Sequence, residues 1–255
     1  MRILLSNDDG ILAPGLAALH AAVRDLGTVH VVAPDSPQSA AGHAITLRRP
    51  LSVRRVRIEG PPPLTGMSVD GRPADCVRLA LRKLVSKPVD LVLAGINAGS
   101  NVGINVFYSG TVAAAAEAAM CGLPAVAFSA SMGEQLDFAP IAAHCREVLD
   151  LLLNIPLAPG ELINVNIPPL GDGRARGIRV VRQSTAGLDD VYLPHLSEDG
   201  TEAYRLGDDY AFLPADQADT DVATLAEGYI TITPLHIDMT RYDQAQQLER
   251  LNTDY

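Results

Sequence analysis

Short apolar segments that alternate with helical segments constrain the fold of this chain more than any other feature of the sequence. An apolar run opens the chain at residues 3–5, and the segment 14–26 that follows reads as a helix with Pro14 near its start and Gly27 after its end. Further strands are expected at 28–33, 90–96, 124–129 and 162–167, extended segments at 44–47 and 51–58, and further helices at 74–85, at 141–153 and after Ser109. This alternation predicts an α/β fold, a mostly parallel sheet with helices on both faces.

The character of the sequence changes near residue 171, where short extended pieces and acidic turns replace the alternation of strands and helices. A strand is expected at 229–235 and a terminal helix at 241–251. We therefore expect a main core of residues 1–170 and a β-rich C-terminal extension of residues 171–255, with a hairpin and the terminal helix. Because its pieces are too short to form a core alone, the extension is expected to serve oligomerisation and to be exchanged between subunits.

Composition excludes several classes of function. The formal net charge of −10 disfavours stable binding to nucleic acid, which needs a basic surface, and aromatic residues make up only 4% of the chain. The 3 cysteines form no CxxC pair, so neither a disulfide framework nor a thiolate zinc site is indicated. No segment is apolar over a length that could span a bilayer, and the chain runs from Met1 directly into a strand, so we expect a cytoplasmic protein with no membrane partner.

Two adjacent carboxylates, Asp8 and Asp9, follow the first strand in a turn marked by Asn7 and Gly10. In open α/β sheets, ligands bind beyond the carboxyl ends of the strands. Two carboxylates there repel each other unless a positive charge joins them, so a divalent cation is the favoured interpretation. The alternative is an Asx-rich turn that caps the next helix.

A polar loop after the second expected strand contains Ser39 and His43. If neighbouring strands bring the loops together, the Ser39 hydroxyl would add an oxygen ligand to the cation site. His43 would approach a substrate bound there. The alternatives are an ordinary loop serine and a structural histidine.

A third loop begins at Asn97 and, through several glycines, delivers Ser109, Gly110 and Thr111 to the start of a helix. Free backbone N–H groups and the positive end of the helix dipole make such a start an anion site, and the two hydroxyls add donors. An ordinary N-cap explains the same residues, and both interpretations can hold together.

Several familiar motifs are absent. The glycines at 95, 99 and 103 do not spell GxGxxG, no lysine of a Walker A loop precedes Ser109, and there is no GxSxG elbow. Cys76 and Arg82 have the spacing of a cysteine phosphatase, but the segment between them reads as helix. Helical geometry would turn the two side chains apart, so Cys76 is predicted to be a buried core residue.

Taken in order, several of these motifs resemble the SurE (stationary-phase survival protein) family of metal-dependent nucleotidases over nearly the whole chain. The resemblance rests on RILLSNDDG, APDSPQSAAGHAITL, RPADCVRLAL, GINAGSNVGINVFYSGTVAAAAEA, NVNIP and ITPL. It implies a Rossmann-like core and a C-terminal extension that takes part in forming a homodimer or homotetramer. The implied reaction is hydrolysis of nucleoside 5′- or 3′-monophosphates to nucleoside and phosphate, with short polyphosphate as a further substrate.

The resemblance also implies roles for individual residues. One divalent metal ion per subunit would be held by Asp8, Asp9, Ser39 and Asn97, and phosphate would meet Asn101, Ser109, Gly110 and Thr111. Oxygen ligands of this kind suit Mg²⁺ or Mn²⁺. Asp8 and Asp9 are the expected catalytic residues, one of which would accept a proton from the attacking water.

Two other mechanisms remain open at this stage. An aspartyl-phosphate phosphatase would use Asp8 as a nucleophile, although that class usually has Asp-x-Asp rather than adjacent aspartates. A metal-dependent nucleotide sensor would bind the same ligand without turnover.

Three residues depart from the pattern common in the family. Ala40 and Ala118 stand where glycine is common, and Arg72 stands where threonine is common. The first change would alter the flexibility of the loop over the metal, and the change at residue 72 would shift substrate preference. Neither removes a predicted ligand.

Overall fold

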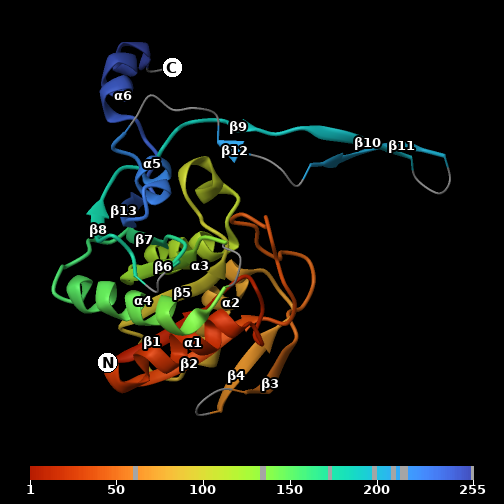
Figure 1. The fold of residues 1–255 in the computed structure, drawn as a ribbon, viewed down its shortest axis with the longest axis vertical. Coiled ribbons are helices and arrows are strands. Elements are labelled where there is room, and N and C mark those ends of the chain that lie inside the picture. The colour runs from red at the N-terminus through yellow and green to blue at the C-terminus, as the bar shows by residue number, and fades with distance from the viewer. Residues whose placement is uncertain are drawn as a thin grey trace.

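A central sheet of nine strands organises the molecule in the computed structural model (Figure 1). The structure describes residues 1–59, 63–132, 136–171, 174–196, 200–207, 211–212 and 218–253. The strand order is β3-β4-β2-β1-β5-β6-β7-β13-β8, and neighbours pair in parallel except β3 with β4 and β7 with β13. The strands are β1 (Arg2–Ser6), β2 (Thr28–Pro34), β3 (Val53–Ile58), β4 (Leu64–Val69), β5 (Leu91–Ala98), β6 (Ala125–Ala130), β7 (Glu161–Ile167), β8 (Ile178–Val180) and β13 (Ile230–His236).

Helices cover both faces of this sheet, which confirms the predicted α/β class. The helices are α1 (Pro14–Val23), α2 (Pro73–Leu79), α3 (Gly110–Met120), α4 (Phe138–Leu152), α5 (Asp221–Ala226) and α6 (Tyr242–Leu248). Side chains alternate across β1: Ile3 and Leu5 pack in a core with α1 and α4, whereas Leu4 packs in a second core with α2 and α3. Strands buried on both faces need apolar residues throughout, which is why they read as continuous apolar runs.

Local sequence explains several helix ends. The Ser109 hydroxyl accepts a hydrogen bond from the Val112 N–H at the start of α3, and Asp137 accepts one from the Ala139 N–H at the start of α4. The expected helix 74–85 is α2 followed by a short π-helical segment, Ala80–Leu84. Three short 3-10 segments, Arg24–Leu26, Gly103–Phe107 and Glu249–Leu251, complete the helical elements within the described residues.

The structure differs from the sequence-based expectations at two places near the edge of the sheet. Residues 44–47 form a loop and not an extended strand, because the Thr46 N–H and hydroxyl donate to the buried Asp75 carboxylate. Strand β4 was not expected, since its sequence contains a threonine, a glycine and a serine among few apolar residues. It pairs antiparallel with β3 along six residues, and this pairing sets the edge of the sheet.

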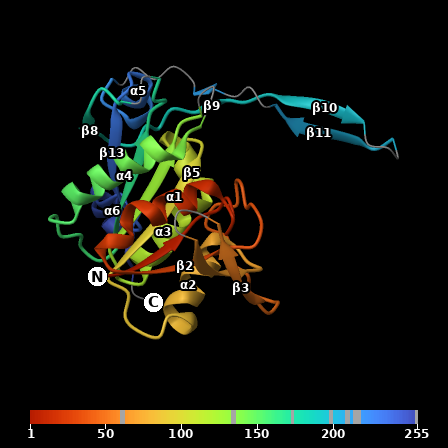
Figure 2. The same cartoon turned by 60° about the horizontal axis from the view of Figure 1, so that its bottom comes forward.

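The C-terminal part contributes to the main sheet and also leaves it. Strands β8 and β13 extend the sheet beyond β7, while β10 (Tyr192–Leu196) and β11 (Glu202–Leu206) form a hairpin that projects from the body in both views (Figures 1 and 2). At its base, β9 (Leu188–Asp189) pairs with β12 (Ala211–Phe212). We keep the division into residues 1–170 and 171–255 as a proposal, with the second part supplying both β13 and the hairpin. Among the described residues, no helix combines the length and apolar character needed to cross a membrane.

Candidate functional site

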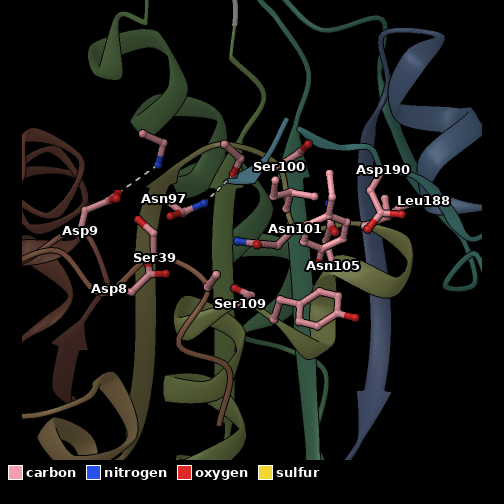
Figure 3. Close-up of a pocket in the computed structure, with 16 residues that line it drawn as sticks. Asp8, Asp9, Ser39, Asn97, Ser100, Asn101, Asn105, Ser109, Leu188 and Asp190 are labelled. Atoms are coloured by element: carbon pink, nitrogen blue, oxygen red, sulfur yellow. Dashed lines mark hydrogen bonds between the residues drawn. The ribbon is translucent and has the colours of Figure 1, made fainter. Parts of the chain in front are cut away.

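A cavity of about 400 Å³ opens at the carboxyl ends of β1 and β5. Figure 3 shows Asp8, Asp9, Ser39 and Asn97 on one side of this cavity and Leu188 and Asp190 on the other. The lining residues are Asp8, Asp9, Ser39, Ala40, Asn97, Ala98, Gly99, Ser100, Asn101, Asn105, Tyr108, Ser109, Leu188, Asp190, Tyr192 and Leu206. Loops far apart in the sequence therefore meet at the edge of the sheet where ligands of open α/β folds bind.

The two adjacent carboxylates are fixed by hydrogen bonds from other loops. Asp8 is 6% exposed, and the Thr111 hydroxyl donates to its Oδ1 atom. The Ala98 N–H donates to Oδ2 of Asp9 at 3.1 Å. The Gln38 N–H donates to the Asp8 carbonyl oxygen at 2.8 Å, so the polar loop containing Ser39 is tied to the same turn. The carboxylates are thus oriented before any ligand binds.

Burial destabilises the ionised forms of Asp8 and Asp9. Desolvation raises the pKa of Asp8, and the neighbouring Asp9 charge raises it further against the opposing hydrogen bond from Thr111. Desolvation likewise raises the pKa of Asp9, although the Ala98 N–H opposes it. A cation between the two carboxylates would offset both effects, because it stabilises the ionised forms.

The remaining polar atoms fit a hard divalent cation. The Asn97 amide nitrogen donates to the Gly99 carbonyl at 2.6 Å, which leaves its amide oxygen as an acceptor at the cavity. The Ser39 hydroxyl reaches the same cavity. Two carboxylates, an amide oxygen and a hydroxyl form the oxygen-rich set that Mg²⁺ and Mn²⁺ prefer. This set contains only two carboxylates. Within the described ranges no group of three or more His, Cys, Asp or Glu side chains could hold a metal ion.

The start of α3 lies directly against Asp8. Ser109 lines the cavity and caps the helix, so the two interpretations of this serine hold together. Gly110 packs so closely that an ideal Cβ there would lie 2.7 Å from the Asp8 Cβ. Thr111 is fully buried and its hydroxyl donates to Asp8, so its side chain orients a carboxylate in this structure.

Asn101 is held by a cluster of buried side chains from neighbouring strands. Its N–H donates to Oδ1 of Asn166 at 2.7 Å, and its carbonyl accepts from the Asn164 amide at 2.7 Å. Its own side-chain amide donates to the Ser129 hydroxyl at 2.8 Å. The NVN segment of β7 therefore fixes the backbone of the loop that lines the cavity, a role that local sequence does not reveal.

Comparison of the sequence with known proteins identifies a family that matches this chain. A match to the family described as "Survival protein SurE" covers residues 3–190. The chain belongs to the SurE family. The "5'-nucleotidase SurE" of Syntrophobacter fumaroxidans is 41% identical over 252 residues, covering 99% of this chain and 100% of that protein. The "5'-nucleotidase SurE 1" of Thermus thermophilus is 42% identical over 254 residues, covering 98% of each.

Solved structures agree with this assignment. The crystal structure of the SurE protein from Aquifex aeolicus matches with a TM-score of 0.83 and 36% sequence identity. The match covers 98% of this chain and 99% of that chain. The SurE fold therefore extends over the complete sheet and the C-terminal part.

The hairpin supplies residues of this SurE site that the sequence did not point to. Four residues of the hairpin and its base, Leu188, Asp190, Tyr192 and Leu206, line the cavity, and we call them the hairpin wall. Figure 3 shows Leu188 and Asp190 on the side opposite Asp8 and Asp9. The four residues lie far from Asp8, Asp9 and Ser39 in the sequence, in or between short strands, so no local pattern marks them.

His43 does not reach the cavity in this SurE-family chain. Its Nε2 atom lies 3.0 Å from Oε2 of the buried Glu117, and Arg78 donates to the other Glu117 oxygen at 2.6 Å. Burial raises the pKa of Glu117, but these two partners outweigh burial and hold it below its usual value. The structure therefore engages His43 in tying its loop to α3, and its expected substrate contact stays a prediction. Cys76 is fully buried, as predicted.

Two departures from the SurE pattern have visible structural effects. Ala40 has a φ of 54°, the left-handed region in which glycine is favoured. The Arg72 guanidinium donates to the Gln38 side chain, so it reaches the loop that contains Ser39.

Replacing Ala40 with glycine is expected to raise the free energy of unfolding by about 1 kcal/mol, because a side chain in the left-handed region costs about that much. The melting temperature should rise by about 2–4 °C. Ala41→Gly is the control, since its φ is not positive and the same change should lower stability. A melting temperature that falls equally in both variants would contradict the assigned strain.

Proposed function

We propose that this protein is a divalent-metal-dependent 5′-nucleotidase that hydrolyses nucleoside monophosphates to nucleoside and phosphate. The observation that carries the proposal is the buried Asp8–Asp9 pair, which faces a cavity together with the oxygens of Ser39 and Asn97. The full-length similarity to proteins named 5'-nucleotidase SurE supports the same reaction. Hydrolysis of 3′-monophosphates and of short polyphosphate is part of the proposal.

The geometry supports the following roles for individual residues. Asp8, Asp9, Ser39 and Asn97 would hold one Mg²⁺ or Mn²⁺ ion per subunit. When bound, such an ion would supply neutralisation of negative charge on the phosphate and a bound water of lowered pKa. The Thr111 hydroxyl and the Ala98 N–H keep the two carboxylates in place, and one of the carboxylates accepts the proton of the attacking water.

The phosphate group would lie at the start of α3. Ser109 and the N–H groups of Gly110 and Thr111 stand at the positive end of the helix dipole, where anions are stabilised. Asn101 would meet another phosphate oxygen. Catalysis by these residues is mostly positioning and electrostatic stabilisation. The cytoplasmic location and the homodimer or homotetramer expected from the sequence stay predictions.

A panel of phosphate esters tests this proposal. After treatment with a chelator, the protein should release no phosphate from nucleoside 5′-monophosphates, and added Mn²⁺ or Mg²⁺ should restore release. Hydrolysis that persists in chelator would contradict the metal role. Tight metal-dependent nucleotide binding without phosphate release would favour a sensor, and a trapped phospho-aspartate would favour covalent catalysis.

A further inference from the structure

Gly103 lies in the loop between β5 and α3, which contributes residues to the cavity and is called the cavity loop below. Side chains from the C-terminal part of the chain bind both the N–H and the carbonyl oxygen of this glycine. The Gly103 N–H donates to Oδ2 of Asp221 at 2.9 Å. The Gly103 carbonyl oxygen accepts from the Gln183 side chain at 2.8 Å. Gly103 has a φ of 57°, so the loop turns sharply at this point. Both polar groups of this residue are therefore fixed by side chains more than seventy residues away.

Asp221 joins three segments through one carboxylate. It is fully buried at the start of α5, and its Oδ1 atom accepts from the N–H groups of Ser184 and Val222, both at 2.8 Å. Its own N–H donates to the Arg182 carbonyl at 2.9 Å. A buried carboxylate is tolerated only when donors satisfy it, and here backbone donors come from three places.

Two of the segments that Asp221 joins lead directly into residues that line the cavity. Gly103 lies two residues after Asn101 and six before Ser109, both of which line the cavity. Ser184 lies four residues before Leu188, where the hairpin wall begins. The asparagines of β7 already hold Asn101, so Asp221 is a second anchor farther along the same loop.

We infer that Asp221 is a positioning residue of this site, which fixes the β5–α3 loop against the hairpin wall so that Asn101 and Ser109 meet the phosphate together. This role rests on the proposed phosphatase function. Asp221 does not line the cavity, and it acts through the Gly103 peptide. Misplacement of binding groups by about 1 Å can cost about 10²-fold in rate, so a lost anchor should be visible in turnover.

Asp221→Asn separates the two contacts. The carboxamide oxygen can still accept from Ser184 and Val222, as Oδ1 does. The amide NH₂ would then face the Gly103 N–H, and the contact to the cavity loop would be lost while the contact to the hairpin segment remains. Asp219→Asn is the matched control, because the charge change is the same and Asp219 is an exposed residue whose ion pair with the Arg182 side chain lies at the surface.

Both variants should be assayed with Mn²⁺ well below their melting temperatures. Asp221→Asn is expected to lower kcat/KM for AMP by about tenfold and to weaken competitive inhibition by inorganic phosphate, whereas Asp219→Asn should stay near the parent protein. Amide hydrogen exchange in residues 100–109 should accelerate only in Asp221→Asn. Gln183→Leu should act on the same loop, and its combination with Asp221→Asn should be less than additive.

An Asp221→Asn protein with a lower melting temperature but unchanged kcat/KM and unchanged exchange would overturn the positioning role, because it would show a purely structural one. Equal effects of the two Asp→Asn changes would overturn it as well. If the parent protein releases phosphate from no nucleotide, the proposed function fails, and the exchange measurement still reports whether Asp221 holds the loop.

Discussion

Asp9→Asn is expected to keep the fold and to lower the turnover of a nucleoside monophosphate by about 10³-fold, the scale at which loss of one preorganised electrostatic group affects a rate. Asparagine can still accept the Ala98 N–H, so the turn should keep its shape. It supplies no negative charge, however, and a neutral amide binds a divalent cation more weakly than a carboxylate. Steady-state kinetics over a range of Mn²⁺ concentrations would measure both effects.

The same substitution should stabilise the metal-free protein near neutral pH. Burial holds the pKa of Asp8 and of Asp9 above their ordinary values, so the folded state binds protons more tightly than the unfolded state. Stability of the metal-free protein therefore falls as the pH rises from the ordinary carboxyl pKa through the raised folded pKa. Removing one charge relieves this loss, and the melting temperature of metal-free Asp9→Asn should exceed that of the parent at pH 7.

Asp150→Asn provides the control for both measurements. Asp150 is a half-exposed residue of α4 that pairs with Arg146, away from the cavity. It should leave turnover and metal dependence unchanged. Full turnover by Asp9→Asn would show that the carboxylate pair is not the catalytic centre, and a metal-free melting temperature below the parent's would show that the pair is not under repulsive strain.

Much of the sheet was predictable because buried parallel strands leave a clear trace. The segments around Leu5, Val31, Leu93 and Ala127 are mostly apolar, the segment around Val165 is apolar on one face, and turn residues follow each of them. Strand β4 has a mixed sequence and depends on its neighbours β2 and β3 for its pairing, so local reasoning passed over it. The prediction of an extended segment at residues 44–47 was wrong for a related reason. The carboxylate of Asp75, which is remote in the sequence, accepts hydrogen bonds from this segment and sets its conformation.

The site residues likewise fall into two groups, those that the sequence predicts and those that it does not. Asp8, Asp9 and Ser39 follow strands that run parallel, and Asn97 lies at the end of another. Their convergence at one edge therefore follows from topology once the strands are recognised. By contrast, the hairpin residues, the asparagines of β7 and Asp221 act through contacts between segments remote in the chain. No local pattern encodes such contacts, and the parallel sheet alone does not specify them.

Gly110→Ala is expected to lower activity and metal affinity by about 10²-fold, although the replaced residue bears no side chain to contribute to chemistry. An ideal Cβ at residue 110 would lie 2.7 Å from the Asp8 Cβ and 3.0 Å from Oδ2 of Asp8. It would also lie 3.0 Å from Cγ of Pro73, so neither side of the helix start offers room. Asp8 or the start of α3 must therefore shift, and either shift would change how the Asp8 carboxylate is placed relative to Asp9.

Two opposing effects decide the stability of this variant. Alanine is favoured over glycine inside a helix by about 1 kcal/mol, and the added methyl group in a packed site costs about 1–3 kcal/mol. We expect the second to dominate, with a loss of about 1–2 kcal/mol in the free energy of unfolding. Gly171→Ala is the control, because no described atom lies within 4 Å of its ideal Cβ. Titration of Mn²⁺ against turnover measures the outcome: if Gly110→Ala needs no more Mn²⁺ than the parent, close packing of α3 against Asp8 does not set the geometry of the metal ligands.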